Sequence, residues 1–225
     1  MTYLSEFGAF AGTGSRNERG QTLEEFLEAY DPKKYDCPCN TVDIAVFRRT
    51  GSEKPSSLQL LMIRRRNHPC IGCWALPGGF VDLRENLEDA AARELQEETG
   101  VSGISLKQNG AWGNYDRDPR WRVITTLYFT ILDHDVHVQA GDDAADARWF
   151  DVSYEETAEN DHSARLHLLL TDPASSLKLE AEALCKTSGE GALRQSKLAL
   201  LGSTPIANDH SLMIMDTIRY IRQFE

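Results

Sequence analysis

The sequence predicts an α/β fold, because strand-like and helix-like patterns follow one another along its 225 residues. Residues 42–47 alternate in the manner of a mostly buried strand. A second apolar run at 58–64 predicts its hairpin partner, across a Gly/Pro/Ser loop at 51–57. Residues 86–100 then fit a helix that has Asn86 as its N-cap and Gly100 as its stop.

Residues 1–35 are expected to form an arm and a short helix that precede the main domain at 36–225. The first twenty residues show no apolar periodicity, which is typical of a mobile arm. Thr22 makes a capping box with Glu25, three positions later, and Asp31-Pro32 ends the helix that this box begins.

Apolar alternation between turn residues predicts further strands after the central helix. They are expected at 105–112, 123–132, 136–140 and 147–150. Residues 166–170 and 177–183 alternate like an antiparallel hairpin, whereas 192–201 fits a helix or a strand equally well.

The last predicted element is a helix that Asp209 or Ser211 caps. Its apolar stripe consists of Ile214, Met215, Ile218 and Ile221. We therefore expect a domain core at 36–152 and 205–222, with a β-rich insertion at 153–204.

Charge and composition limit the partners of the chain. Its 24 Lys and Arg residues against 35 Asp and Glu residues give a net charge of −11, which repels DNA and RNA phosphates, so we expect no nucleic-acid partner. No apolar run approaches the roughly 18 residues of a membrane span, and the first residues lack a secretory signal. We therefore expect no membrane partner and a cytoplasmic location. The five cysteines, Cys37, Cys39, Cys70, Cys73 and Cys185, are expected to be reduced thiols.

Three glutamates of the central helix are the strongest candidates for chemistry. At about 100° per residue, Glu94 and Glu98 share a stripe with Leu87 and Ala91, and Glu97 lies beside Glu94. The carboxylates therefore align with the face that packs inward. Because clustered carboxylates repel one another when partly buried, either their pKa values rise or a cation neutralises them.

A hard divalent cation suits such a cluster. Mg²⁺ binds carboxylate oxygens, keeps positions for water and bridges substrate phosphates. Arg93, one position before Glu94, can hold a carboxylate in one rotamer, as metal geometry requires. The Gly78-Gly79 turn lets backbone approach a ligand without a Cβ in the way, so both glycines are candidate substrate contacts.

This stretch resembles the signature of the Nudix hydrolases. Gly79, Glu85, Arg93-Glu94-Leu95, Glu97-Glu98 and Gly100-Val101 match all nine fixed positions of that signature. The resemblance extends to the ADP-ribose-pyrophosphatase-like branch through 74–81, 116–120, 141–150 and Asp209-His210. Asn208 stands where that branch usually has Phe.

The resemblance implies a mixed β-sheet between helices, and hydrolysis of the diphosphate in a nucleoside diphosphate linked to another group. ADP-ribose, or a related nucleotide sugar or dinucleotide, is the implied substrate. The resemblance also places Mg²⁺ or Mn²⁺ on Glu94, Glu97 and Glu98, gives Arg93 an orienting role in catalysis, and makes Glu85 an accessory acidic residue. Water is the expected nucleophile, and its general base stays open between Glu97 and an acidic loop that contains Asp142, Asp143 and Asp146.

Arginines outside the central helix are further candidates. Arg117 and Arg120 are candidate phosphate clamps, because guanidinium groups bind phosphate through paired hydrogen bonds. The run Arg64-Arg65-Arg66 fits a solvated strand end better than a ligand site. Three aromatic residues beside the clamp are candidates to stack on adenine, although core packing is the commoner role: Trp112, Tyr115 and Trp121.

Two other functions and one further metal site stay open. The main alternative is a catalytically silent Nudix protein that senses a ligand as a regulator, although the acidic charge and the few residues after the last helix disfavour a DNA-reading module. Isopentenyl-diphosphate isomerase shares the fold but relies on a catalytic Cys and a divergent form of the signature, hereafter the Nudix box, so the intact Nudix box at 79–101 argues against it. Zinc on the pairs Cys37/Cys39 and Cys70/Cys73 is disfavoured by the one-residue spacing of the first pair.

We also expect a homodimer, because the N-terminal helix and the insertion add apolar faces that the core does not need. A two-fold partner would cover Phe26, Leu27 and 166–170. The alternative is that these elements cap the sheet edges of the monomer.

Overall fold

The computed structural model describes residues 3–50, 57–141 and 144–224. The chain forms two compact units, Met1–Cys37 and Pro38–Glu225. The loop expected at 51–57 lies outside the described residues except for Ser57, which begins a strand.

The N-terminal unit contains the 3-10 helix η1 (Gly8–Phe10) and the α-helix α1 (Leu23–Ala29). The predicted capping box is confirmed: Thr22 Oγ1 accepts the Glu25 N–H at 3.2 Å, and Glu25 Oε2 accepts the Thr22 N–H at 2.8 Å. The expectation that the first twenty residues lack structure is wrong at η1. The apolar stripe of α1 is not buried, and Phe26 is 42% exposed.

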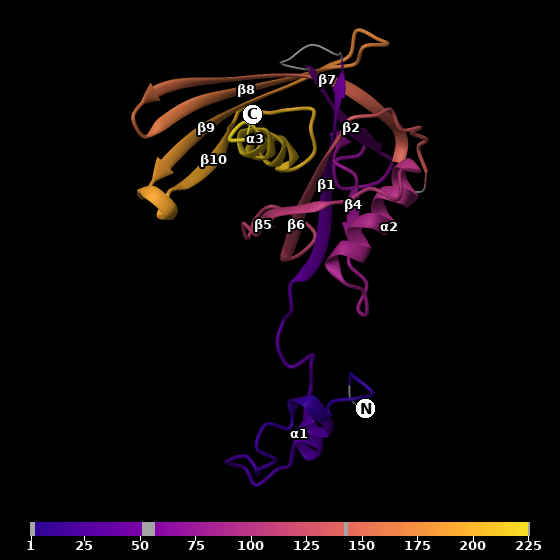
Figure 1. Ribbon diagram of the computed structural model, residues 1–225, viewed down its shortest axis with the longest axis vertical. Coiled ribbons are helices and arrows are strands. Elements are labelled where there is room, and N and C mark those ends of the chain that lie inside the picture. Colours follow the sequence, from indigo (N-terminus) through magenta and orange to yellow (C-terminus); the bar gives the residue numbers. More distant parts are fainter. Residues whose placement is uncertain (1–2, 51–56, 142–143, 225) are drawn as a thin grey trace. The chain divides into compact units, whose positions relative to one another are not determined.

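One mixed sheet organises the second unit (Figure 1). Its strands are β1 (Cys39–Thr50), β2 (Ser57–Arg65), β3 (Trp74–Ala75), β4 (Gly78–Phe80), β5 (Lys107–Trp112), β6 (Val123–Leu132), β7 (Ala144–Asn160), β8 (Ser163–Thr171), β9 (Lys178–Ser188) and β10 (Gln195–Leu201). Within the described ranges their order is β10-β9-β8-β7-β2-β1-β6-β5, with β3 beside β2 and β4 beside β1. The predicted β1–β2 hairpin is antiparallel, whereas β1 and β6 run parallel.

Two helices cover the two faces of this sheet, as Figure 1 shows. Val42, Ile44 and Val46 of β1 pack in the same cluster as the buried residues of α2 (Leu87–Thr99). Phe47, one position out of phase, packs on the other face with α3 (His210–Ile221). The alternation of β1 therefore serves both helices, and the predicted mixed sheet between helices is confirmed.

The insertion continues the same sheet. The predicted hairpin is confirmed as the antiparallel pair β8 and β9, and the ambiguous segment at 192–201 forms η2 (Gly191–Leu193) and β10, which pairs with β9. β7 is much longer than the predicted strand at 147–150: its first part pairs with β2 and its second part, from Asp151 onward, with β8. The second part carries mostly exposed polar residues, so no apolar alternation in the sequence predicts it.

The expected strand at 136–140 is wrong. The backbone of this region binds the end of α2 instead, because Gln139 N–H donates to Thr99 O at 2.9 Å and Gly141 N–H donates to Glu98 O at 3.1 Å. Its valines, Val136 and Val138, pack against the α2 side of the core rather than in a ladder. Among the described helices, none is long and apolar enough to cross a membrane.

The extension formed by β8–β10 shares its core with α3. Leu168 of β8 is fully buried in the same cluster as Met213 and Ile218 of α3, whereas Leu193 in η2 is 78% exposed. We expect Leu168→Ala to reduce the free energy of unfolding by about 2–5 kcal/mol, because the lost side chain leaves a cavity. Leu193→Ala is the matched control and should leave the thermal midpoint nearly unchanged. Equal midpoints for both variants, measured by calorimetry, would contradict this assignment of the core.

Candidate active site

A cavity of about 150 Å³ opens where β1 and β4 meet the start of α3. Its walls bring together Gly78, Gly79, Arg117 and Arg120, the four predicted substrate contacts, together with Glu98. Arg65 and Arg66 also line it, so two members of the arginine run that sequence favoured as a solvated strand end face this cavity.

Arg93 holds the carboxylates beside this cavity. Its Nε and Nη2 donate to the two oxygens of Glu85 at 2.8 and 2.9 Å, and its Nη1 donates to Glu94 at 2.8 Å and to Glu97 at 3.0 Å. The remaining Nη2–H donates to Phe80 O at 3.0 Å, so all five guanidinium N–H groups are used. These contacts raise the pKa of Arg93, with Glu85 as the main cause, and lower the pKa of Glu85.

Glu94 lies against the backbone of Gly79. A Cβ at Gly79 would lie 2.5 Å from the Glu94 carboxyl carbon, so a larger residue here would displace this carboxyl group. Burial raises the pKa of Glu94, although hydrogen bonds from Arg93 act in the opposite direction.

Glu98 is the most buried carboxylate of the α2 helix, with 6% of the residue exposed. Its Oε2 accepts the Gly78 N–H at 2.8 Å. Burial raises the pKa of Glu98 to about 8, the charges of Glu94 and Asp43 add to this effect, and the Gly78 hydrogen bond and Arg65 oppose it. β4 pairs with β1 at Gly78 and Asp43, which fixes the Gly78 N–H beneath α2.

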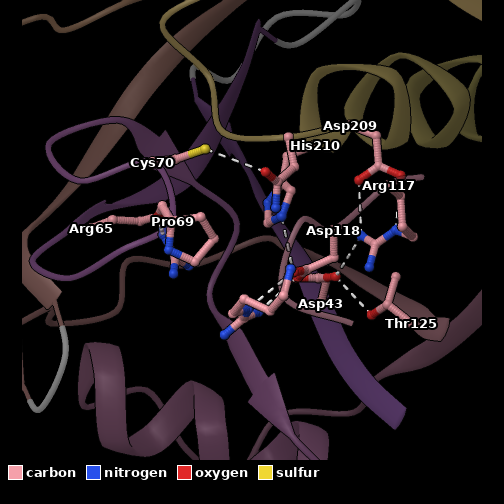
Figure 2. Close-up of polar contacts among 11 residues, drawn as sticks. Asp43, Arg65, Pro69, Cys70, Arg117, Asp118, Thr125, Asp209 and His210 are labelled. Atoms are coloured by element: carbon pink, nitrogen blue, oxygen red, sulfur yellow. Dashed lines mark hydrogen bonds and ion pairs between the residues drawn. The ribbon is translucent and has the colours of Figure 1, made fainter. Parts of the chain in front are cut away.

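The start of α3 completes the floor of the cavity (Figure 2). Asp209 accepts two hydrogen bonds from Arg117, at 3.0 Å from Nε and 2.8 Å from Nη2, so the buried guanidinium is already paired. Asp43 accepts a hydrogen bond from Thr125 at 2.7 Å and lies 3.7 Å from His210 Nε2. His210 Nδ1 accepts the Leu76 N–H at 3.0 Å, which makes Nε2 the protonated nitrogen of a neutral ring.

Sequence reasoning assigned no role to Asp43 or Thr125. A signal was present, because Asp43 interrupts the apolar residues of β1 on the side that faces α3. A buried carboxylate in a strand requires a donor; here Thr125 of β6 donates to Asp43, and His210 of α3 lies nearby, both distant from it in the sequence.

Arg120 is paired as well. Its Nε and Nη2 donate to the two oxygens of Asp118 at 3.0 and 2.8 Å, and its guanidinium lies 5.0 Å from the centre of the Phe80 ring. Burial alone would raise the pKa of Asp118, but these hydrogen bonds lower it overall. Unlike Arg117, the Arg120 side chain is 43% exposed, so part of it faces water.

The other predicted residues do not contribute to the described lining of this cavity. Asp142 and Asp143 lie outside the described residues, and Asp146 is paired with Arg148 at 2.6 Å. The three aromatic candidates for stacking are absent from the described lining: Trp112 packs against the core, and Tyr115 and Trp121 are 82% and 53% exposed.

The carboxylates of α2 fit a hard divalent cation in their chemistry. Carboxylate oxygens are the ligands that Mg²⁺ and Mn²⁺ prefer. Two of these acids, Glu94 and Glu98, have a pKa that burial raises, and a cation would relieve the cost of ionising them. In residues 3–50, 57–141 and 144–224 no three acidic, histidine or cysteine side chains converge as a complete metal site requires.

Comparison with known families identifies the class of this fold and site. Residues 39–169 match the NUDIX domain, and the chain belongs to this family. The resemblance read from the glutamate-rich motif is therefore confirmed.

Individual relatives add detail. The chain is 38% identical over 149 residues to the ADPR responsive transcriptional repressor NtrR of Acinetobacter baylyi, and 44% identical over 96 residues to an ADP-ribose pyrophosphatase of Methanocaldococcus jannaschii. These matches cover 65% and 42% of the chain, and 57% and 56% of the relatives, so the chain spans little more than half of each. The crystal structure of a MutT/nudix family protein from Enterococcus faecalis is similar over 97% of the chain and 76% of that protein, with a TM-score of 0.68 and 30% identity.

Glu98 should make the stability of the metal-free protein depend on pH. Its pKa rises from 4.5 in the unfolded chain to about 8 in the fold, so its contribution to stability is complete below pH 4.5 and is lost as the pH rises toward 8. Glu98→Gln removes this loss, because an amide does not ionise. We expect the thermal midpoint of the wild type to fall relative to that of the variant between pH 5 and pH 9 in EDTA. If the thermal midpoints of the wild type and of Glu98→Gln, measured by calorimetry, changed in parallel with pH, the raised pKa of Glu98 would be contradicted.

Proposed function

We propose that this chain is a pyrophosphohydrolase that cleaves the diphosphate of a nucleoside diphosphate derivative. One observation carries the proposal: Arg93 of α2 binds Glu94 and Glu97 of the same helix and Glu85 just before it, and this helix also places Glu98 in the cavity wall. The cavity has cationic residues as well, since Arg65, Arg66 and Arg120 line it, and a diphosphate carries charges of the opposite sign.

In this proposal Glu94, Glu97 and Glu98 hold Mg²⁺ or Mn²⁺. When bound, such an ion lowers the pKa of a water ligand and offsets the charge of the phosphates. Arg93 keeps the carboxylates in fixed rotamers, because each oxygen that it binds loses rotational freedom. Gly78 holds Glu98 through its N–H, and Glu85 anchors Arg93 from outside the helix.

The attacking water needs a base to take its proton. Glu97 is the Nudix-box carboxylate that is both tied to the cluster by Arg93 and open to water, with 42% of its side chain exposed. We assign it this role among the described candidates, because Asp146 is occupied by Arg148. The product of the attack would be two phosphate-bearing fragments, one of them a nucleoside monophosphate.

ADP-ribose is the first substrate to test. One relative is named an ADP-ribose pyrophosphatase and another is named ADPR responsive, so both names concern the same small molecule. The second name also favours a second function: binding ADP-ribose as a signal without turning it over. The 38% identity to that repressor over 65% of this chain is the observation that favours it.

A homodimer and a cytoplasmic location belong to the same proposal. The exposed apolar side chains of α1, Phe26 among them, support a contact with a second copy. Light scattering tests this point, and a mass near 25.2 kDa at micromolar concentration would rule the dimer out.

The enzyme and the sensor give different results with one panel of nucleotides. Protein with Mg²⁺ or Mn²⁺ should release AMP from ADP-ribose or from a related nucleoside diphosphate derivative. EDTA should abolish the release, and added Mg²⁺ should restore it. Chromatography of the products measures the turnover. Binding of ADP-ribose in calorimetry without any turnover would favour the sensor and would overturn the enzyme.

Glu97→Gln should reduce kcat on the order of 10²-fold or more, because it removes a charge from the metal-holding cluster and a base from the water. Glu88→Gln is the matched control: Glu88 lies on the same helix, is exposed, and does not line the cavity. Circular dichroism should show that both variants keep the fold. Turnover of Glu97→Gln within a few-fold of the control at saturating Mg²⁺ would remove Glu97 from the mechanism.

A further inference from the structure

Two thiols meet in the loop that follows β2. Cys70 and Cys73 close a tight turn in which the Cys73 N–H donates to Cys70 O at 3.0 Å and Gly72 has a φ of +78°. Residues at the ends of such a turn have Cα atoms within about 7 Å, and a disulfide needs roughly 4.4–6.8 Å. Both cysteines are free thiols and half-buried.

The two side chains also interact. Burial is the main cause that raises the pKa of Cys73, and the neighbouring Cys70 thiol raises it further through its charge and a hydrogen bond. Arg65 opposes this effect. The two thiols thus influence each other in the reduced protein, and neither is fully buried as Cys185 is, at 1% exposure.

The turn is connected to the wall of the cavity through Cys70, whose polar contact is a dashed line in Figure 2. Cys70 Sγ donates to Asn208 Oδ1 at 3.3 Å. Asn208 lines the cavity with a φ of +46°, and it directly precedes Asp209, which holds Arg117, and His210, which holds the Leu76 N–H. Cys70 thus holds Asn208, the residue directly before the two residues at the start of α3 that line or support the site.

We propose that Cys70 and Cys73 are a reversible redox site, at which a low-molecular-weight disulfide such as glutathione disulfide closes an intramolecular disulfide beside the cavity. The Cys70 thiolate attacks one sulfur of the oxidant, so the disulfide of the oxidant breaks and one glutathione thiolate leaves and takes up a proton. The Cys73 thiolate then attacks Cys70 in the mixed disulfide and releases the second glutathione. Two protein thiols are oxidised and one glutathione disulfide is reduced to two thiols.

Closure changes the wall of the cavity. The new bond removes the Cys70 S–H, so Asn208 Oδ1 loses its donor. Asn208 is then free to leave its left-handed conformation, which shifts the start of α3 and its hold on Arg117. This consequence rests on the proposed function, and we expect the oxidised protein to turn over substrate severalfold more slowly than the reduced protein.

Peptide mass tests the disulfide without any assay of activity. The full chain is equilibrated in glutathione buffers of increasing oxidised fraction, alkylated and digested with trypsin. Residues 67–84 form one tryptic peptide that contains Cys70 and Cys73 and no other cysteine. We expect this peptide to lose two hydrogen atoms and to resist alkylation, while the peptide of Cys185 stays alkylated. A peptide that keeps both thiols free, or carries only glutathione adducts, in buffers that oxidise a short dithiol control peptide would overturn the proposal.

Two variants separate the disulfide from its effect on the site. Cys73→Ser leaves Cys70 and its hydrogen bond to Asn208 in place but cannot form the intramolecular disulfide. Its turnover should therefore not change on oxidation. Loss of turnover on oxidation, and its recovery with dithiothreitol, should be seen only in the wild type. Cys70→Ser should also block the ring. Unchanged wild-type turnover with the disulfide formed would overturn the link to the cavity. If reduced protein lacks turnover altogether, the proposed function fails, and the peptide mass still decides the redox site.

Discussion

The organisation of the site depends on one guanidinium group, that of Arg93, which binds three carboxylates. Glu85, Glu94 and Glu97 would repel one another at this distance, and each is instead bound to Arg93. Every N–H of that group is used, in a planar arrangement that a lysine ammonium cannot reproduce. Three carboxylates against one guanidinium leave the cluster with excess negative charge, and Glu98, which accepts a backbone N–H instead, adds to it when it ionises. This excess is what a divalent cation would neutralise.

The positive charges of the cavity are partly neutralised by carboxylates. Arg117 and Arg120 each have a carboxylate partner in the absence of substrate, Asp209 and Asp118. Pairing holds the two guanidinium groups in defined positions, and it also means that a phosphate must compete with a carboxylate for their N–H groups. Arg65 and Arg66 donate to backbone carbonyls, Pro69 O and Ala144 O, and such neutral acceptors compete less strongly for a guanidinium than a carboxylate does.

Local signals predicted the Nudix-box helix and its glutamates well. The spacing of Glu94, Glu97 and Glu98 on one helix needs no information from elsewhere in the chain, and the stop at Gly100 is confirmed by its left-handed conformation. The floor of the site was not predictable in this way. Asp43 meets Thr125 and His210 only after the sheet has formed, so no short-range spacing encodes their contact. β7 shows the same limit, because its polar half is a strand only through its pairing with β8.

β7 also determines how separable the extension is from the rest of the unit. A single strand pairs with β2 along its first half and with β8 along its second, and α3 packs in one cluster with core and extension strands alike. Removal of the added strands would therefore take away part of the apolar cluster in which the buried residues of α3 pack. The residues that hold the site floor, Asp209 and His210, begin that same helix. The added strands therefore help to hold in place the helix from which the site begins, so a change in the extension can reach the site without touching any residue that lines the cavity.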